Sequence, residues 1–377
     1  MNVDLIYALE QLEKERGIKK ELILEAIEIA LISAYKKNFS SNQNIKVSVD
    51  RKTGEVKAFA VKNVVEKVSN ESEEISLEEA RKKDPNLEEG DVFEVEVTPK
   101  KFGRIAAQTA KQVVLQRIRE AERDMIFDEF FSKIGDIVTG VVQRGERGNV
   151  IVDLGKTEAV LVRKEQALNE RYNFNDRIKV YVKEVKRTTK GPIIYVSRAA
   201  VGLVERLFRL EVPEIVNGLV EIKNISREAG SRTKIAVYCK EEDVDPVGAC
   251  VGPRGTRVQN IVDELKNEKI DIIKWSSNAE EYVASSLSPA KPIRVVINEE
   301  EKTASVVVPD SQLSLAIGKE GQNVRLAARL TGWKIDIKSA SKHRQTIEKQ
   351  LLNFDSSALF KADEGNYEDD NNEENNE

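Results

Sequence analysis

Two short glycine-bearing segments carry the clearest chemical signal in this sequence of 377 residues. Gly252-Pro-Arg-Gly255 and Gly318-Lys-Glu-Gly321 each follow small apolar residues and precede a helical pattern of apolar positions. Glycine lets a backbone approach a ligand closely, and the N–H groups at the start of a helix attract phosphate. Each segment also carries one cation, Arg254 or Lys319. These residue types therefore indicate contact with a phosphodiester backbone.

The two segments belong to a tandem repeat. They lie 66 residues apart, and the tetrapeptide Lys-Ile-Asp-Ile follows at residues 269–272 and again 65 residues later at 334–337. One Gly-x-x-Gly alone would mean little, because 20 glycines produce roughly one by chance. Gly145 and Gly148, for example, lie between two strand-like runs and predict only a hairpin turn. A repeated helix, glycine turn, helix and strand predicts two KH domains, which bind single-stranded nucleic acid.

Other reactive residues offer little chemistry. His343 is the only histidine and lies in a basic segment, so a histidine-dependent nucleophile could use no other residue. A Walker-type phosphate loop is missing, because Gly318-Lys319 is followed by Glu and lacks the upstream glycine. Cys239 and Cys250 follow no metal-ligand spacing and predict small buried thiols in a reducing compartment. We therefore expect no enzymatic activity, no metal and no cofactor.

Charge is distributed unevenly along the chain. The formal net charge is −5, yet residues 362–377 contain eight acidic and no basic side chains. Residues 1–132 hold 22 basic and 26 acidic side chains, which leaves residues 133–361 with a net charge of +7. This basic excess coincides with the expected nucleic-acid modules and predicts modest, salt-sensitive affinity. The N-terminus does not resemble a signal peptide, and no apolar run could cross a membrane, so we expect a cytoplasmic protein.

The elements expected before the repeats form a mixed head and a barrel. Helical spacing covers residues 4–35 with an interruption at Gly17, and a long connecting helix covers 105–131. The head should also contain strands at 45–49, 56–61 and 92–97, with an acidic loop-prone stretch at 70–91. Five further strand-like runs lie at 137–143, 149–154, 157–162, 177–185 and 193–196. Five short strands in so few residues predict an S1-type OB-fold barrel, which binds single strands on one face.

The barrel should contribute charge to binding more than base stacking. Its second and third strands offer Val150, Val152, Leu161 and Val162 and no aromatic residue. The candidate contacts on the barrel are Arg144, Arg147, Arg163, Lys164, Lys186 and Arg187.

We expect an α+β multidomain protein. Its parts are an N-terminal domain with the connecting helix at 1–132, the S1-type barrel at 133–199, the first KH domain at 200–288, the second at 289–346 and an acidic disordered tail at 347–377. A helix at 201–210 should lead into the first KH domain. The two prolines of the linker 288–292 should hold the KH domains rigidly paired.

The order of these parts resembles the NusA family of bacterial transcription termination and antitermination factors. Four longer strings carry the same resemblance, at residues 108–118, 208–215, 245–252 and 316–327. The similarity covers about residues 1–346, nearly the whole predicted folded chain. Some members also carry two acidic repeats at the C-terminus, which we do not expect here because the sequence becomes short, polar and acidic after Leu352.

The resemblance implies a non-catalytic factor that binds RNA polymerase and nascent single-stranded RNA. The head would dock near the RNA exit channel, at the β-subunit flap. The factor would promote pausing and intrinsic termination and join antitermination complexes with other Nus factors, as a monomer. The predicted RNA-binding residues are Arg144, Arg147, Arg163, Lys164, Gly252, Pro253, Arg254, Gly255, Arg257, Gly318, Lys319, Glu320, Gly321, Asn323 and Arg325.

Two other classes of function use the same modules. A ribosome-assembly or RNA-chaperone protein would bind RNA without polymerase. A phosphorolytic exoribonuclease would need a large catalytic domain, and the cap subunit of such an enzyme would need a ring-binding partner. An acidic helical head fits neither well. Copurification of polymerase would separate the first alternative from the elongation factor, and incubation of labelled RNA with phosphate and magnesium would test for the second.

Overall fold

The chain forms two units. The computed structural model describes residues 3–39, 43–70, 72–241 and 243–349. The first unit comprises Met1–Glu129 with Arg187–Pro192, and the second comprises Phe130–Lys186 with Ile193–Glu377. Residues 347–349, predicted as the start of the disordered tail, are helical, and from residue 350 on the predicted tail lies outside the described residues.

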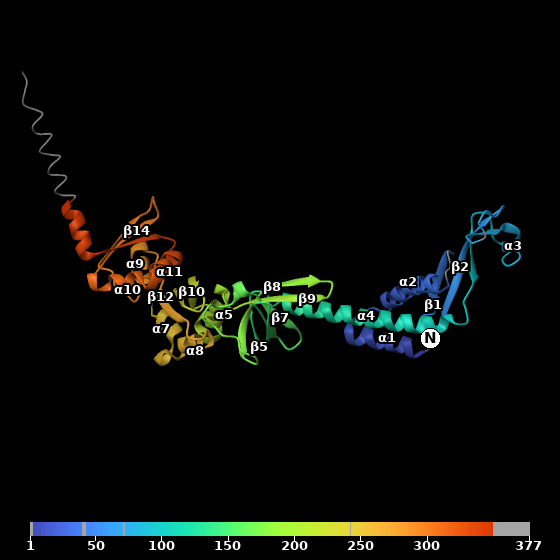
Figure 1. The fold of residues 1–377 in the computed structure, drawn as a ribbon, viewed down its shortest axis with the longest axis horizontal. Helices are drawn as coiled ribbons and strands as arrows, with labels where there is room; N and C mark the ends of the chain where they lie inside the picture. Colours follow the sequence, from blue (N-terminus) through green and yellow to red (C-terminus); the bar gives the residue numbers. More distant parts are fainter. Residues whose placement is uncertain (1–2, 40–42, 71, 242, 350–377) are drawn as a thin grey trace, which may run out of the picture. The chain divides into compact units, whose positions relative to one another are not determined.

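The first unit packs helices against one small sheet (Figure 1). Its elements are α1 (Val3–Arg16), α2 (Lys20–Phe39), β1 (Ile45–Val49), β2 (Val56–Val65), β3 (Glu74–Ser76), α3 (Leu77–Arg81), β4 (Val92–Glu96) and α4 (Phe102–Phe131). Strand β2 is central and pairs with β1, β3 and β4. Alternate residues of β1 are buried against α2 and α4, in one core that includes Ile27, Val47 and Phe102. The predicted interruption at Gly17 is confirmed, since its φ of 68° ends α1.

The stretch 70–91 is not a plain loop, contrary to the prediction from its acidity. It contains β3 and α3, and Ile75 and Ala80 pack with Val64 in a small core of their own. The Ser76 hydroxyl accepts a hydrogen bond from the N–H of Glu79 and so caps α3. Acidic residues dominate the composition, but Leu77 and Leu87 also pack against this core, so a few apolar positions and one cap order the segment.

The second unit begins with the predicted five-stranded barrel. Its strands are β5 (Ile137–Glu146), β6 (Asn149–Asp153), β7 (Glu158–Leu161), β8 (Arg177–Thr188) and β9 (Gly191–Ser197), closed in the order β5-β6-β7-β9-β8. Arg147 and Gly148, with φ of 50° and 83°, form the two-residue turn between β5 and β6. The hairpin predicted at Gly145 and Gly148 is thus confirmed.

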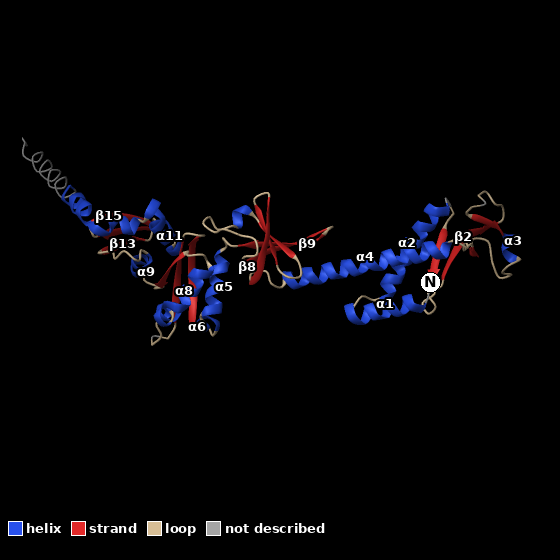
Figure 2. Cartoon of the chain, turned by 60° about the horizontal axis from the view of Figure 1, so that its bottom comes forward, coloured by secondary structure: helices blue, strands red, loops and turns tan. Residues whose placement is uncertain are grey.

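Two similar α/β units follow the barrel. The first KH unit contains α5 (Val201–Glu211), α6 (Pro213–Val216), β10 (Val220–Glu228), β11 (Arg232–Cys239), α7 (Pro246–Val251), α8 (Thr256–Glu264) and β12 (Lys269–Lys274). The second contains α9 (Ala279–Ser286), β13 (Arg294–Asn298), β14 (Thr303–Val308), α10 (Leu313–Ile317), α11 (Gln322–Thr331) and β15 (Lys334–Ser339). In both, the central strand pairs antiparallel with the strand before it and parallel with the last. Figure 2 shows each sheet with its helices.

Helix α9 differs from its expected placement with the first KH domain. Its side chains Val283 and Leu287 are buried in the core of the second KH unit, together with Val306 and Ala316. The linker 288–292 therefore lies after a helix that already belongs to the second core. The reason is that an amphipathic helix packs where its apolar stripe finds a partner, which the local sequence does not specify.

Candidate nucleic-acid interface

The two Gly-x-x-Gly loops have nearly the same backbone conformation. Gly252 has φ 76° and ψ 172°, and Gly318 has φ 76° and ψ 171°. The third loop residue is left-handed in both, with φ 53° at Arg254 and 52° at Glu320. These angles agree although the residues between the glycines differ, so the repeat conserves a loop shape and not only a composition.

The first glycine of each loop is also required by close packing. A Cβ added to Gly252 would lie 2.6 Å from Cγ of Arg257, and one added to Gly318 would lie 2.7 Å from Cβ of Asn323. Each loop therefore turns tightly onto the helix that follows it. This brings the loop backbone to the surface at the start of α8 and α11.

Each loop has two exposed residues between its glycines, and one of the two is a cation. Pro253 and Arg254 are exposed in the first loop, and Lys319 and Glu320 in the second. Among the residues that the structure describes, no side chain caps the N-terminus of α8 or of α11, so the first-turn N–H groups have no side-chain acceptor there. Such a helix start can accept a phosphate. The second loop should bind it less strongly, because Glu320 stands where the first loop has Arg254.

Three of the predicted barrel cations gather at one corner. Arg147 occupies the β5–β6 turn, and Arg163 and Lys164 lie in a 3-10 turn at Arg163–Glu165. The two segments touch, because the amide of Gln166 donates to the carbonyl of Gly148 at 3.0 Å. All three cations are exposed and could face a phosphate backbone together.

The other predicted barrel cations have partners within the protein. Arg144 makes a bidentate pair with Glu158 at 2.8 and 2.9 Å, and this hydrogen bonding lowers the pKa of Glu158. The Nζ of Lys186 lies 5.2 Å from the ring centroid of Tyr195. The valines and leucine at positions 150, 152 and 161 are buried inside the barrel, so they do not form a binding face.

Asn323 is a correction to the predicted site. Its side chain is only 3% exposed, and its amide donates to the carbonyls of Leu287 and Ala316 at 3.0 Å each. It joins α9, α10 and α11 inside the second KH unit and cannot present its amide to RNA in this conformation. Its Oδ1 is buried with no partner among the described residues.

Arg257 and Arg325 also make contacts that the sequence did not reveal. Arg257 donates to Glu214 at 2.9 Å and to the carbonyl of Ala249 at 2.6 Å, inside the first KH unit. Arg325 donates to Glu228 at 2.7 Å, and this bond joins α11 of the second KH unit to β10 of the first KH unit. Each cation is therefore already engaged at the base of its loop.

The two KH units share a buried interface. Ala236 and Ile273 on the sheet of the first KH unit pack with Tyr282 of α9 and Leu330 of α11. The carbonyl of Leu330 accepts hydrogen bonds from Tyr282 at 3.1 Å and from Asn224 at 3.1 Å. The two loops are consequently held on one body, as the short linker predicted, although helix packing contributes most of the contact.

Buried ion pairs join the barrel to the first KH unit. Arg198 is fully buried, and its guanidinium donates to Glu170 of the barrel and, at 3.1 Å, to Glu264 of α8. A second buried pair lies inside the first KH unit itself, where Arg227 pairs with Glu268 at 2.8 Å and donates to the carbonyl of Ala200 at the start of α5. Burial alone would raise the pKa of Glu268, but the hydrogen bond from Arg227 lowers it below its usual value. Sequence reasoning missed these residues because isolated charges carry no signal of their partners.

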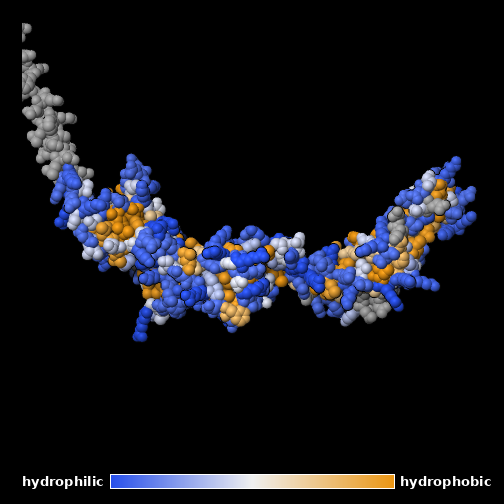
Figure 3. Space-filling model, viewed as in Figure 1, coloured by the Kyte–Doolittle hydropathy of each residue, from blue (hydrophilic) through white to orange (hydrophobic). Residues whose placement is uncertain are grey.

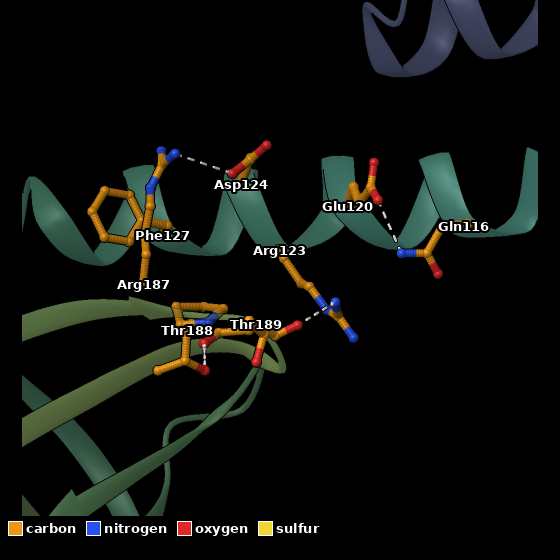
Figure 4. A pocket seen from close by; sticks show the side chains of 10 residues that line it. Gln116, Glu120, Arg123, Asp124, Phe127, Arg187, Thr188 and Thr189 are labelled. Atoms are coloured by element: carbon orange, nitrogen blue, oxygen red, sulfur yellow. Dashed lines mark hydrogen bonds and ion pairs between the residues drawn. The ribbon is translucent and has the colours of Figure 1, made fainter. Parts of the chain in front are cut away.

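A separate cavity of about 290 Å³ lies in the first unit, between α4 and residues 187–192 (Figure 4). Arg187, a predicted RNA contact, lies 4.2 Å from the ring centroid of Phe127 and pairs with Asp124 at 3.6 Å. Arg123 donates to the carbonyl of Thr189 at 3.3 Å. Cations and acids both line this cavity, so it lacks the uniform positive charge that a phosphate backbone needs.

Within the described residues, no cluster of His, Cys, Asp or Glu could hold a metal ion. Burial raises the pKa of the Cys250 thiol to about 12, which makes this cysteine a poor nucleophile. None of the helices in the same described ranges has the length and apolar character needed to span a bilayer.

An S1-type barrel with two glycine-loop units on one body defines the class of single-strand nucleic-acid-binding proteins. Family models match along the chain: NusA N-terminal domain at residues 4–124, S1 RNA binding domain at 132–197, NusA-like first KH domain at 198–275 and NusA-like second KH domain at 279–345. The chain belongs to the NusA family.

Curated relatives agree over nearly the full length. The transcription termination/antitermination protein NusA of Halalkalibacterium halodurans is 58% identical over 95% of this chain and 94% of its own length. That of Bacillus subtilis is 58% identical over 96% and 97%, and that of Thermus thermophilus is 43% identical over 90% and 91%. The solution structure of the N-terminal domain of NusA from B. subtilis is 60% identical, covers 33% of this chain and 99% of that chain, and gives a TM-score of 0.31.

Proposed function

We propose that this protein is a transcription elongation factor that binds RNA polymerase and nascent single-stranded RNA. It promotes pausing and intrinsic termination and takes part in antitermination with other Nus factors. The observation that carries the proposal is the pair of matching Gly-x-x-Gly loops on one body. Residues 4–124 of the same chain match the NusA N-terminal domain. Relatives of nearly equal length carry the name transcription termination/antitermination protein.

RNA follows the exposed corner of the barrel and then the two loops. The proposed contacts are Arg147, Arg163 and Lys164 on the barrel, residues 252–255 in the first loop and residues 318–321 in the second. Arg144, Arg257 and Arg325 contribute indirectly, because each is already paired with a glutamate. The modular division at 1–132, 133–199 and 200–346 supports this order, with the second KH unit starting at α9.

The N-terminal unit docks on the polymerase near the RNA exit, at the flap of the β subunit. An exposed apolar ridge supports this role: Leu22 and Ile29 lie seven residues apart on one face of α2 and are 58% and 68% exposed. Apolar patches are visible among the hydrophilic residues of this unit (Figure 3). The factor acts as a monomer in the cytoplasm, without catalysis or a cofactor.

Capture of purified core RNA polymerase by the full chain tests the docking role. The double variant Leu22→Glu, Ile29→Glu should lose capture and stronger hairpin pausing, while RNA binding stays intact. Leu168→Glu is the matched control, because Leu168 is an exposed apolar residue of the barrel. Equal capture of polymerase by all three proteins would refute the proposal that the α2 ridge contacts polymerase. No capture by the wild type, with RNA binding intact, would favour ribosome assembly.

Binding of single-stranded RNA tests the second role. The double variant Arg254→Ala, Lys319→Ala should bind RNA less tightly than the wild type does. This loss of affinity should be larger at low salt than at high salt. An unchanged affinity would refute the proposed contacts. Degradation of labelled RNA in phosphate and magnesium would instead indicate an enzyme.

A further inference from the structure

Glu228, the last residue of β10, is in contact with three side chains of α11. Its Oε2 accepts a hydrogen bond from Gln322 at 2.8 Å, and its Oε1 accepts one from Arg325 at 2.7 Å. The guanidinium of Arg329 lies 3.9 Å from the same Oε1. Gln322 directly follows Gly321, the last glycine of the second loop. Glu228 of the first KH unit therefore contacts the first turn of α11, which directly follows the second loop.

The contact is directional as well as electrostatic. Gln322 also donates to the hydroxyl of Ser231 at 2.8 Å, so two groups at the β10–β11 turn define its position. The hydrogen bond from Arg325 lowers the pKa of Glu228, so the carboxylate stays ionised at neutral pH. The Glu228 side chain is 23% exposed and that of Arg325 is 44% exposed. Partly exposed ion pairs add little to stability, so the main effect of this cluster is on position.

Helix α11 is also held at its other end. The carbonyl of Leu330 accepts from Asn224 of β10 at 3.1 Å, and the Leu330 side chain packs against Ala236 and Ile273. A helix fixed at only this end could still tilt. Glu228 supplies the second point of attachment, at the end that carries the loop.

We propose that Glu228 is a positioning residue that sets the spacing at which the two loops bind one RNA strand. It does so through its hydrogen bonds with Gln322 and Arg325. Arg325 is therefore paired with Glu228 and does not contact RNA. This inference rests on the proposed RNA-binding function. Two sites held at a fixed separation bind a matching strand with high effective concentration, and that advantage falls when the separation fluctuates.

The test measures affinity for RNAs that contain two segments of about four randomised nucleotides, one for each loop. Abasic ribose-phosphate spacers of increasing length, from none to about eight units, join the two segments. The full-length wild type should bind most tightly at one spacer length. Glu228→Gln should lose about three- to tenfold in affinity at that length and show a broader optimum. Its affinity for RNA with one segment should stay unchanged.

Glu221→Gln is the matched control. Glu221 lies on the same strand and pairs with Lys223 at 2.7 Å within the first KH unit, so it should keep the wild-type spacer profile. Ser231→Ala removes one acceptor of Gln322 without changing charge and should broaden the optimum less than Glu228→Gln does. This milder variant keeps the test decisive even where Glu228→Gln unfolds.

The outcomes separate the inference from the function on which it rests. Absence of RNA binding by the wild type would refute the proposed function. Wild-type binding with the same spacer profile in Glu228→Gln and Ser231→Ala would refute the positioning role alone. Tighter binding of one-segment RNA by Glu228→Gln would show that Arg325 contacts RNA once it is released, which also overturns the inference.

Discussion

The two glycines of one loop should respond differently to an added methyl group. Gly318, with φ 76° and ψ 171°, lies in a region that is almost restricted to glycine. Its Cβ would also lie 2.7 Å from Cβ and 2.8 Å from N of Asn323. Gly321, with φ 73° and ψ 15°, is left-handed, and its Cβ would meet only Val324, at 4.0 Å.

These geometries give different costs. For Gly318→Ala, backbone strain contributes about 1–3 kcal/mol. Overpacking against Asn323, whose backbone cannot move away freely, adds about 1–3 kcal/mol. For Gly321→Ala, only left-handed strain of about 1–2 kcal/mol applies, and the stiffer unfolded chain offsets part of it. The first variant should therefore be about 3 kcal/mol less stable than the second.

Hydrogen exchange of the amides of β14 and β15 in the full chain measures this difference, because it reports the opening free energy of the second KH unit itself. Gly252→Ala and Gly255→Ala provide the same comparison in the first loop, where a Cβ at Gly252 would meet Arg257 at 2.6 Å and one at Gly255 would meet nothing within 4 Å. Equal losses for Gly318→Ala and Gly321→Ala, or a larger loss for the latter, would refute the reasoning.

Three other perturbations have defined outcomes. Arg198→Ala should destabilise the second unit by about 3–5 kcal/mol in urea unfolding, because it leaves the buried carboxylate of Glu170 without its cation; a loss near zero would contradict this. Because the pKa of Glu228 is lower when folded, its contribution is complete above its unfolded pKa of about 4.3 and disappears as the pH falls through the folded value. The difference in unfolding midpoint between wild type and Glu228→Gln should therefore shrink as the pH falls below about 4.3 and vanish below the folded pKa, and a constant difference would argue against the pair. Lys319→Ala should reduce the slope of log affinity against log salt for single-stranded RNA by about 0.7, as expected for one lost phosphate contact, whereas an unchanged slope would remove Lys319 from the interface.

Local signals in the sequence predicted the loops and most elements correctly. Glycine adopts a positive φ more readily than any other residue, so Gly252, Gly255, Gly318 and Gly321 are visible without any structure. Periodicity likewise located the five strands of the barrel, since side-chain alternation depends only on neighbours in the chain. The repeated tetrapeptide located only the last strand of each KH sheet, β12 and β15. The acidic stretch 70–91 was mistaken for a loop because its few apolar residues are outnumbered by charges.

Placement of the polar side chains was decided by tertiary structure. Asn323 and Arg325 follow the second loop and resemble ligands in the sequence, yet one is buried and the other pairs with Glu228, 97 residues away. Likewise Arg198 pairs with Glu264, 66 residues away, inside the junction between barrel and KH unit. The order of the modules, the glycine loops and the family could all be read from the sequence, although helix α9 was assigned to the wrong KH unit. Which cations remain exposed for RNA could not be read from the sequence, because an ion pair depends on which elements the fold brings within reach of one another.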